Sequence, residues 1–473
     1  MNEDKKIDLK LILSIVATGI MSFSGVVVET AMNVTFPSLM EEFQIGTSSV
    51  QWITTGYLLV LAVIIPTSSY LKKRFRMKSL FMTAIILFII GTVLAAVTPV
   101  FSLLLLSRLI QGVGTGIALP LMFNITMEQV PEEKLGVMMG TASLITAMAP
   151  AVGPSLGGFI VNHFGWRMVF IALLPLLILS FIMGATSIRQ ISDTRKIPFQ
   201  TLDYLFLAVG FSCFIFATST ASSTGWTSLP VAVLFIVSLL CLAVFYYRCF
   251  HRQNPLIDIR VFRCLPFTLS VLVLIFIQFV CLGLGYLIPN YAQLVSGENA
   301  FTAGCLLLPG CLLGAFLSPV SGKLLDRFGA ARPILFGNIC IIFSLACFTL
   351  FTRRLELFPC IGFYIFFALG QGCSVGNTMT NGLRQLPQEL NADGNAVINT
   401  LQQLAGAIGT SVVTTIVAAS QASLPGDTAL ATQQGSQDAF CLLAAITILI
   451  LICSCGVFLS IRSSEKIDIA HVR

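Results

Sequence analysis

Long apolar runs of about 20 residues dominate this chain, and each is long enough to cross a membrane as a helix. Fourteen such runs can be marked along the 473 residues. Only 10% of the residues are charged and 56% are hydrophobic, whereas about 25% of a soluble domain is charged. No water-soluble fold could bury so much apolar surface. The predicted spans are residues 10–34, 50–70, 79–98, 100–126, 134–162, 166–187, 202–220, 228–249, 267–293, 300–321, 333–352, 357–383, 391–420 and 438–461.

The positions of Lys and Arg predict the orientation of these spans, because cytoplasmic loops carry an excess of basic residues. With both termini on the cytoplasmic side, all but four of the 27 Lys and Arg residues lie in inner loops and tails. The exceptions are Arg167, Arg353 and Arg354 in outer loops and Arg108 within a span. The net charge of +6 then reflects contact with anionic membrane lipids, and we expect no nucleic-acid partner.

The sequence contains no pattern for a cofactor or a metal ion. Its 14 Cys residues all follow residue 212 and lack the loop spacing of a disulfide framework or a metal site. The three His residues are widely separated, and no Gly-x-x-x-x-Gly-Lys-Ser/Thr nucleotide-binding run occurs. Ionisable groups deep within spans are too few for a catalytic set. We therefore predict neither an enzyme nor an ATP-driven pump.

Two patterns recur eight spans apart. The basic turn Ser69–Lys78 follows the second span, and the related turn Gly322–Gly329 follows the tenth. Gln111-Gly112 in the fourth span has a counterpart in Gln371-Gly372 in the twelfth. Repeated halves are typical of secondary transporters. Since a simple repeat of six spans would give an offset of six, two spans have been inserted between the halves.

The repeat predicts an all-α integral membrane protein of two six-helix bundles with an inserted two-helix hairpin. The first bundle comprises residues 1–187 and the second comprises residues 251–473. Residues 188–250 form the linker and the hairpin, beginning with the polar stretch Arg189–Gln200.

The fifth span contains the run Ala149–Gly158, which is rich in Gly and Pro. Small residues let helices approach closely in lipid, and Pro bends them. The run therefore predicts a pliable helix contact of the kind that a rocking helix needs, although a simple packing face has the same composition. Its distinctive residues are Pro150, Gly153, Pro154, Gly157 and Gly158.

Together these features resemble the major facilitator superfamily, and within it the fourteen-span drug:proton antiporters. The resemblance covers nearly the whole length. Its motifs are Thr30-Ala-Met-Asn33-Val-Thr-Phe-Pro37, Arg108-x-x-Gln111-Gly112-x-Gly114, Gly153-Pro154-x-x-Gly157-Gly158, Trp166-Arg167, Pro255-Leu-Ile-Asp258-Ile-Arg260-Val-Phe262-Arg263 and Leu307-Leu-Pro309-Gly310.

The resemblance implies the major facilitator fold and the export of amphiphilic small molecules, by alternating access, against an inward flux of protons. It assigns conformational roles to Gln111, Gly112 and the Gly and Pro residues of the fifth span. It also places an inner gate at the two basic turns, where the matching residues are Arg74, Asp326 and Arg327.

The first basic turn departs from the family pattern Gly-x-Leu-x-Asp-Arg-x-Gly. Ser69, Lys73 and Arg76 replace the first Gly, the Asp and the last Gly, so this turn has lost its acid. The second turn keeps Asp326 and both glycines. We therefore expect gating to depend more on the second half.

A second departure concerns the acid of the first span. The family's Asp falls on Val28, with Glu29 one place later. One residue is about 100° of helix rotation, so Glu29 replaces that Asp only if the helix is turned or unwound there.

Glu29 and Arg108 are the predicted proton-coupling pair. Glu29 is the one acidic residue deep within a predicted span, and Arg108 is the one basic residue so placed. Counted along their helices, both lie roughly 12 Å below the outer boundary. A nearby guanidinium favours the ionised carboxylate, and a movement that separates the two favours its protonation. A static ion pair that only fixes helix packing is the alternative. In the second half Ala368 takes the place of Arg108. We therefore expect proton coupling to depend on the first bundle.

A mostly apolar cavity with a few hydrogen-bonding groups would suit an amphiphilic ligand. Each polar residue in a span can equally join two helices. The substrate-site candidates are Asn33, Tyr57, Gln278, Tyr286, Asn290, Gln371 and Asn377.

These inferences predict a proton-coupled multidrug exporter in a bacterial plasma membrane. We expect a monomer that contacts membrane lipids, protons and an amphiphilic or lipid-like substrate. Two alternatives stay open at this point. One is a lipid or glycolipid exporter of the same fold, and the other is a non-transporting membrane sensor or a channel.

Overall fold

The computed structural model describes residues 7–50, 52–191, 193–195, 197–252, 255–423 and 427–472, and every regular element among them is a helix. The chain divides into two compact units. The first unit comprises Met1–Glu132, Ile145–Ser219 and Leu229–Ile257. The second unit comprises Glu133–Leu144, Thr220–Ser228 and Asp258–Arg473. The bundle boundaries drawn from the sequence, at residues 187 and 250, stay a prediction.

Thirteen helices of the described chain are long and apolar enough to cross a membrane. A fourteenth is obtained by counting Glu132–Pro150 and Val152–Phe164, which meet at a bend of 42°, as one span. The all-helical membrane fold predicted from the apolar runs is confirmed. The placement of both termini on the cytoplasmic side stays a prediction, and the words inner and outer below follow it.

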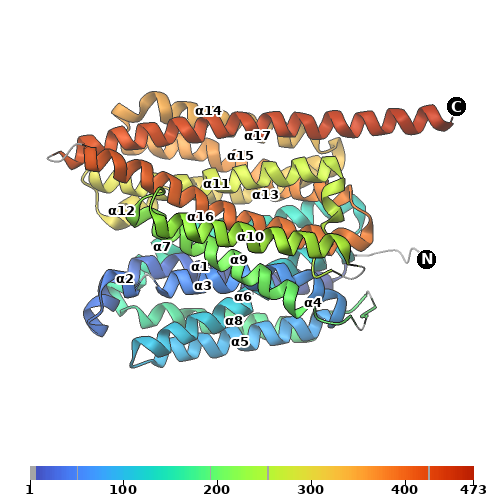
Figure 1. Cartoon of the computed structure of the whole chain (residues 1–473), viewed down its shortest axis with the longest axis horizontal. Helices are drawn as coiled ribbons and strands as arrows, with labels where there is room; N and C mark the ends of the chain where they lie inside the picture. Colours follow the sequence, from blue (N-terminus) through green and yellow to red (C-terminus); the bar gives the residue numbers. More distant parts are fainter. Residues whose placement is uncertain are drawn as a thin grey trace. The chain divides into compact units, whose positions relative to one another are not determined.

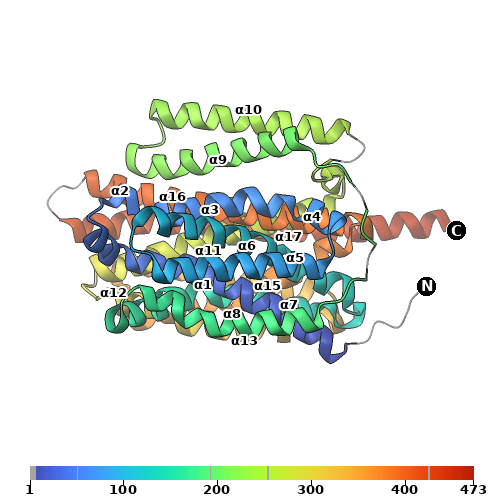
Figure 2. The same cartoon turned by 90° about the horizontal axis from the view of Figure 1, so that it is seen from below.

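The helices of the first unit run along the long axis of the views in Figures 1 and 2. They are α1 (Leu9–Phe43), α2 (Thr47–Val50), α3 (Trp52–Ile64), η1 (Ile65–Thr67), α4 (Ser68–Arg74), α5 (Met77–Val97), α6 (Phe101–Gln129), the later part of α7 (Leu135–Phe164), α8 (Arg167–Ser187), most of α9 (Thr201–Thr224) and α10 (Leu229–His251). The short turn η2 (Glu132–Lys134) precedes α7.

The second unit contains the remaining helices. They are η3 (Ile259–Arg263), α11 (Leu265–Leu294), α12 (Ala300–Cys305), α13 (Leu308–Phe328), α14 (Ala331–Phe351), η4 (Thr352–Arg354), α15 (Leu357–Arg384), η5 (Gln388–Leu390), α16 (Asn391–Ser423) and α17 (Thr428–Val472). The first part of α7 also belongs to this unit.

The same helix pairs recur in both units. In the first unit α5 packs against α6 and α8, and α1 also packs against α6 and α8. In the second unit α14 packs against α15 and α17, and α11 packs against the same two helices. These pairings match α1, α5, α6 and α8 to α11, α14, α15 and α17. They agree with an offset of eight spans. In the order of the chain, the hairpin α9–α10 then stands between the two repeats.

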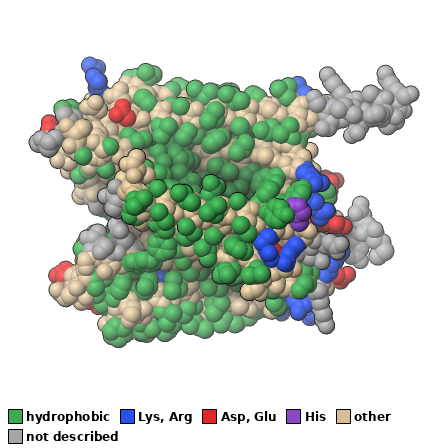
Figure 3. Space-filling model, in the orientation of Figure 1, with side chains coloured by type: hydrophobic (Ala, Val, Ile, Leu, Met, Phe, Trp, Pro, Cys, Tyr) green, Lys and Arg blue, Asp and Glu red, His purple; other side chains and the backbone are tan. Residues whose placement is uncertain are grey.

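The hairpin helices α9 and α10 lie side by side in both cartoon views (Figures 1 and 2). Near the inner end Arg248 donates from Nε to the buried carboxylate of Asp203 over 2.5 Å. The outward face of α10 is apolar and exposed, for example at Leu229 and Leu239. Figure 3 shows hydrophobic side chains across the middle of one molecular face, with Lys and Arg mostly toward one end. This distribution suits a belt of lipid around the helices.

An ionic cluster joins α1 to α8 at the outer end of the first unit. Arg167 donates to both carboxylate oxygens of Glu42, over 3.0 and 2.7 Å, and to the carbonyl of Thr98 over 2.8 Å. The Trp166 indole donates to Glu42 over 2.7 Å. The hydrogen bonds from Arg167 hold the pKa of Glu42 below its usual value. The stabilisation is therefore present at neutral pH and is lost as the pH falls through that lowered pKa.

Candidate functional site

Helix α6 approaches its neighbours closely because its motif residues are small. A Cβ at Gly112 would lie 3.0 Å from the Val60 side chain of α3, and one at Gly114 would lie 2.7 Å from the Ala84 carbonyl of α5. Larger residues would push these helices apart. The close approach brings polar side chains of α3 and α5 against the α6 segment that carries Arg108 and Gln111.

Arg108 is fully buried, with 0% of its side chain exposed. Its Nη1 donates to Gln111 Oε1 over 2.6 Å, and Gln111 in turn donates to the Thr92 hydroxyl of α5 over 2.9 Å. Its Cζ lies 4.2 Å from the centroid of the Tyr57 ring, a cation–π distance. Within the described chain, Arg108 Nε and Nη2 have no hydrogen-bond partner. One edge of a buried guanidinium is therefore open to a further acceptor.

Glu29, the predicted proton carrier, is half-buried on α1. Its carboxylate interacts electrostatically with Arg108 and with Tyr57. No ion pair within 4.0 Å joins Glu29 to Arg108 among the described residues. The two charges are thus close enough to influence each other and are not in contact. The role of the pair in proton transfer is not tested by this geometry and stays a prediction.

Tyr57 connects the helices that carry these two charges. Its hydroxyl donates to the Gly25 carbonyl of α1 over 2.9 Å and is 2.8 Å from the Thr115 hydroxyl of α6. A Cβ at Gly25 would lie 2.4 Å from the Thr115 oxygen, so only Gly fits there. The sequence suggested Tyr57 as a substrate-site residue. Tyr57 is fully buried, with 0% exposure, and its role in a substrate site stays a prediction.

The Gly- and Pro-rich run of α7 faces α1 beside Glu29. A Cβ at Gly153 would lie 1.8 Å from the Thr30 hydroxyl, and one at Gly157 would lie 2.8 Å from the Ala31 side chain. Gly158, in contrast, has only Val34 at an ordinary 3.7 Å. Pro150 and Pro154 both lie inside the helix. Gly153 and Gly157 therefore form a close contact with the turn of α1 that follows the carboxylate.

At the predicted inner gate, Asp326 contacts the first turn of α7, within the second unit. Its two carboxylate oxygens accept from the backbone N–H groups of Gly136 and Val137 over 2.9 and 3.1 Å. Arg384 lies 3.3 Å from the same carboxylate. Arg327 is exposed and stacks on Phe328, with 5.2 Å from Cζ to the ring centroid. Of the three predicted gate residues, Asp326 is the one bonded to the first turn of α7, and the gating role of all three stays a prediction.

The corresponding turn of the first unit ends α4, where Arg74 is half-buried. In this turn the basic residue Lys72 forms an ion pair with Glu128 of α6 over 3.0 Å. The backbone carbonyl of Lys73 accepts from the N–H of Arg195 in the linker over 2.8 Å. This turn therefore binds its own unit and the linker.

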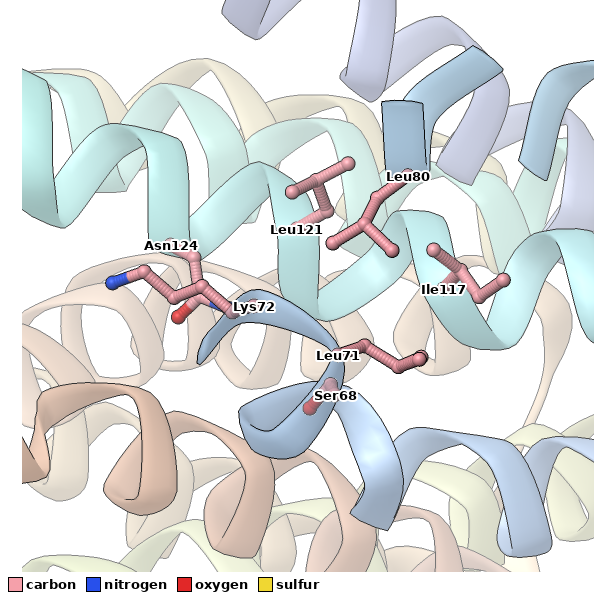
Figure 4. A pocket seen from close by; sticks show the side chains of 7 residues that line it. All are labelled: Ser68, Leu71, Lys72, Leu80, Ile117, Leu121 and Asn124. Atoms are coloured by element: carbon pink, nitrogen blue, oxygen red, sulfur yellow. The ribbon is translucent and has the colours of Figure 1, made fainter. Parts of the chain in front are cut away.

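A small pocket lies between α4, α5 and α6 near this turn (Figure 4). Its empty volume, including the open mouth, is about 210 Å³. In the close-up, Lys72 and Asn124 lie together at one side, apart from the leucine side chains (Figure 4). The lining residues are Ser68, Leu71, Lys72, Leu80, Ile117, Leu121 and Asn124. None of them is among the substrate-site candidates taken from the sequence.

The second unit contains most of those candidates. On α11, Gln278, Tyr286 and Asn290 recur at intervals of eight and four residues and are half-buried. Asn290 donates to the Tyr286 hydroxyl over 3.0 Å, and its own carbonyl oxygen has no partner in the described chain. Gln371 of α15 lies 3.2 Å from the Cys281 sulfur of α11.

The two other candidates, Asn377 and Asn33, lie apart from the polar stripe formed by Gln278, Tyr286 and Asn290 of α11. Asn377 is buried and donates to the Ser321 hydroxyl of α13 over 2.7 Å, which is a helix–helix contact. Asn33 is exposed near the outer part of α1 and accepts from Thr54 over 3.1 Å. The structure thus brings Gln278, Tyr286, Asn290 and Gln371 to α11 and its neighbour α15, and leaves Asn33 and Asn377 in other surroundings.

Sequence reasoning missed Thr92, Thr115 and Gly25 as members of the Arg108 network. Isolated Thr and Gly residues are common in membrane helices because they permit close packing. The signal that could have identified Thr115 is its spacing, since it follows Gln111 by one helical turn and lies on the same face. Thr92 gives no comparable signal.

A family model described as Major Facilitator Superfamily matches residues 18–410. The lincomycin resistance protein LmrB of Bacillus subtilis is 36% identical over 415 residues, which cover 87% of this chain and 86% of that protein. LmrB of Listeria monocytogenes is 37% identical over 411 residues, covering 86% and 87%. A multidrug resistance protein B homolog of Mycobacterium tuberculosis is 28% identical over 393 residues, covering 82% and 73%.

Among solved structures, the human organic anion transporter MFSD10 (TETRAN) superposes with a TM-score of 0.64 at 11% identity. The match covers 94% of this chain and 99% of that chain, and it supports the fold. The matched family consists of transporters rather than enzymes, and the relatives named above are bacterial. With its many apolar helices, the chain is a multi-pass plasma-membrane protein and belongs to the Major Facilitator Superfamily.

Proposed function

We propose that this protein is a proton-coupled exporter of amphiphilic drugs that works by alternating access. The names of its bacterial relatives, lincomycin resistance protein and multidrug resistance protein B homolog, support drug efflux. Efflux against a gradient needs an energy source. The sequence lacks a nucleotide-binding run that could support ATP hydrolysis. We therefore infer that an ion gradient drives efflux.

The observation that carries the proposal is the open edge of buried Arg108 within electrostatic range of Glu29. A guanidinium in the middle of a membrane costs at least a few kcal/mol and is usually functional. Protonated Glu29 would leave Arg108 without a charged partner, and ionised Glu29 would be attracted to its Nε and Nη2 atoms. Each proton bound or released would therefore change the force between α1 and α6.

Cargo would use the uncharged polar stripe of α11. Gln278, Tyr286 and Asn290 offer hydrogen bonds without a charge, next to Gln371 of α15. No acidic residue lies in the span interior of α11 or α15. Such a surface suits neutral, zwitterionic or monocationic amphiphiles better than dications, because a dication would need a second buried carboxylate.

The Glu29→Gln variant tests the coupling. Gln keeps the size of the side chain but cannot release a proton, so the variant should lose drug transport driven by a pH gradient and keep counterflow of labelled drug. The measurement uses purified protein in proteoliposomes with a lincosamide, a cationic dye and a lipid analogue as cargo. Glu41→Gln, an exposed acid on the same helix, is the matched control.

Three results would count against the proposal. Unchanged pH-driven transport by Glu29→Gln would remove this carboxylate from coupling. Counterflow of the lipid analogue alone would replace the drug cargo by a lipid, and absence of counterflow for every cargo would favour a sensor or a channel.

A further inference from the structure

Tyr57 lies near both charges of the proposed coupling pair. Its ring lies against the Arg108 guanidinium at 4.2 Å, and it interacts electrostatically with Glu29 as well. Its hydroxyl is bonded to Gly25 of α1 and lies within hydrogen-bond distance of Thr115 of α6. Gly25 lies four residues, or one turn, before Glu29. Tyr57 therefore contacts both charged helices, with its hydroxyl at Gly25 of α1 and Thr115 of α6 and its ring at Arg108.

The aromatic ring of Tyr57 stabilises the Arg108 guanidinium in place of hydrogen bonds that its Nε and Nη2 atoms do not make. A fully buried guanidinium normally uses all its N–H groups in hydrogen bonds. Arg108 uses Nη1 with Gln111, and within the described chain it leaves Nε and Nη2 unbonded. The face of an aromatic ring attracts a desolvated cation without consuming an N–H group. The ring thus stabilises the guanidinium while its open edge stays available.

No other charged group of the described chain competes at this position. Arg108 is hydrogen-bonded to the uncharged Gln111 of α6, which in turn donates to the uncharged Thr92 of α5. The side of α7 that faces α1 brings Gly153 and Gly157, and the only ionisable residue of α8 is Arg167 at its outer start. Glu29, Tyr57 and Arg108 are the titratable groups that interact here.

We propose that Tyr57 is a positioning residue that keeps Arg108 apart from Glu29, and so sets the pH at which the carboxylate exchanges its proton. The inference rests on the proposed function, since it assumes that Glu29 is the carrier. Without the ring, the open edge of Arg108 would turn to Glu29 and form the ion pair that the structure lacks. The ionised carboxylate would then persist to lower pH.

The test replaces Tyr57 by Phe, by Leu and, through suppression of a nonsense codon, by phenylalanines with increasing ring fluorination. Phe keeps the ring, so the pH of half-maximal drug-driven proton release should stay near that of the parent protein. Leu should move it by about one pH unit to the acid side. Fluorination weakens attraction to a cation at nearly constant shape and should give graded shifts in the same direction, even if the Leu variant does not fold.

The outcomes separate this inference from the proposed function. If the parent protein releases no proton with drug, the proposed function fails. If the parent protein couples normally and the fluorinated variants lose rate without any shift of the pH profile, Tyr57 is structural and the positioning role is wrong. A Phe variant shifted as far as the Leu variant would assign the effect to the hydroxyl contacts with Gly25 and Thr115 and would also overturn the role of the ring.

Discussion

Asp326 makes a contact that its counterpart in the first half cannot make. Its carboxylate accepts two backbone N–H groups from the first turn of α7, where the helix dipole favours a negative charge. The matching position in the first half is Lys73, whose ammonium would be repelled by a helix N-terminus. The loss of an acid in one repeat is therefore a loss of one helix-end contact, and the second repeat retains it.

The Asp326→Asn variant should weaken the contact with α7. An amide can accept with one oxygen only and carries no charge, so about 1–3 kcal/mol is lost at a buried, charge-assisted site. The backbone N–H groups of Gly136 and Val137 should then exchange with deuterium about tenfold faster or more, as measured by mass spectrometry of the protein in nanodiscs.

Drug transport by the Asp326→Asn variant should fall as well. Lys323→Gln, an exposed change on the same turn, is the control and should leave both readings unchanged. Exchange at Gly136 and Val137 that does not respond to Asp326→Asn would contradict the contact.

The sequence predicts the surroundings of some single residues better than those of others. The burial of Arg108 followed from its place in an apolar run, because a helix of known length fixes depth. Its partners did not follow, since Gln111 and Tyr57 contact it through side-chain directions and helix packing. For the same reason, the sequence predicts that Glu29 lies at the depth of Arg108, but it does not predict the distance between the carboxylate and the guanidinium.

At the scale of elements, α7 depends on two glycines that face α1. Gly153→Ala would place a methyl group 1.8 Å from the Thr30 hydroxyl, so the helices must separate or strain, at a cost of about 1–3 kcal/mol. Gly158→Ala meets only Val34 at 3.7 Å and is the matched control. We expect the first variant to unfold at lower temperature in detergent and to transport more slowly, and the second to resemble the parent protein. Equal behaviour of the two alanine variants would contradict the proposed α1–α7 contact.

Helix bounds were largely predictable, and the exceptions have physical causes. The predicted span 50–70 is divided into α3, η1 and α4, with Pro66 inside the 3-10 turn. Pro lacks a backbone donor and disrupts regular α-helical bonding. Helix α17 begins at Thr428, ten residues before the predicted span, because Asp427 caps it by accepting from Leu430 N–H over 2.9 Å. Hydropathy alone does not register such polar helix ends.

At the scale of the whole molecule, the orientation in the membrane is the main prediction. Single cysteines would be introduced, in a background without the 14 native ones, at Ser296 in a predicted outer loop and at Glu133 in a predicted inner one. Both positions are exposed. A membrane-impermeant maleimide should label Ser296→Cys in intact cells and Glu133→Cys only after permeabilisation. The opposite pattern would reverse the orientation derived from the basic residues.

The overall plan of spans, repeat and hairpin was readable from the sequence because lipid imposes length and polarity on every helix. The division into compact units was less readable. The chain segment Glu133–Leu144 belongs to the second unit although α7 continues into the first. This grouping depends on which neighbours the Gly- and Ser-containing faces meet, as Ser318 of α13 meets the Gly140 carbonyl over 2.9 Å.

The unequal basic turns have a consequence for the engineering of this chain. Each half carries a charged residue that the other half lacks. The first half has the buried Arg108, whose counterpart is Ala368, and the second half has Asp326, whose counterpart is Lys73. A protein assembled from two copies of the first half would have two residues like Arg108 and none like Asp326. A protein assembled from two copies of the second half would have two residues like Asp326 and none like Arg108. The two repeats are therefore not interchangeable.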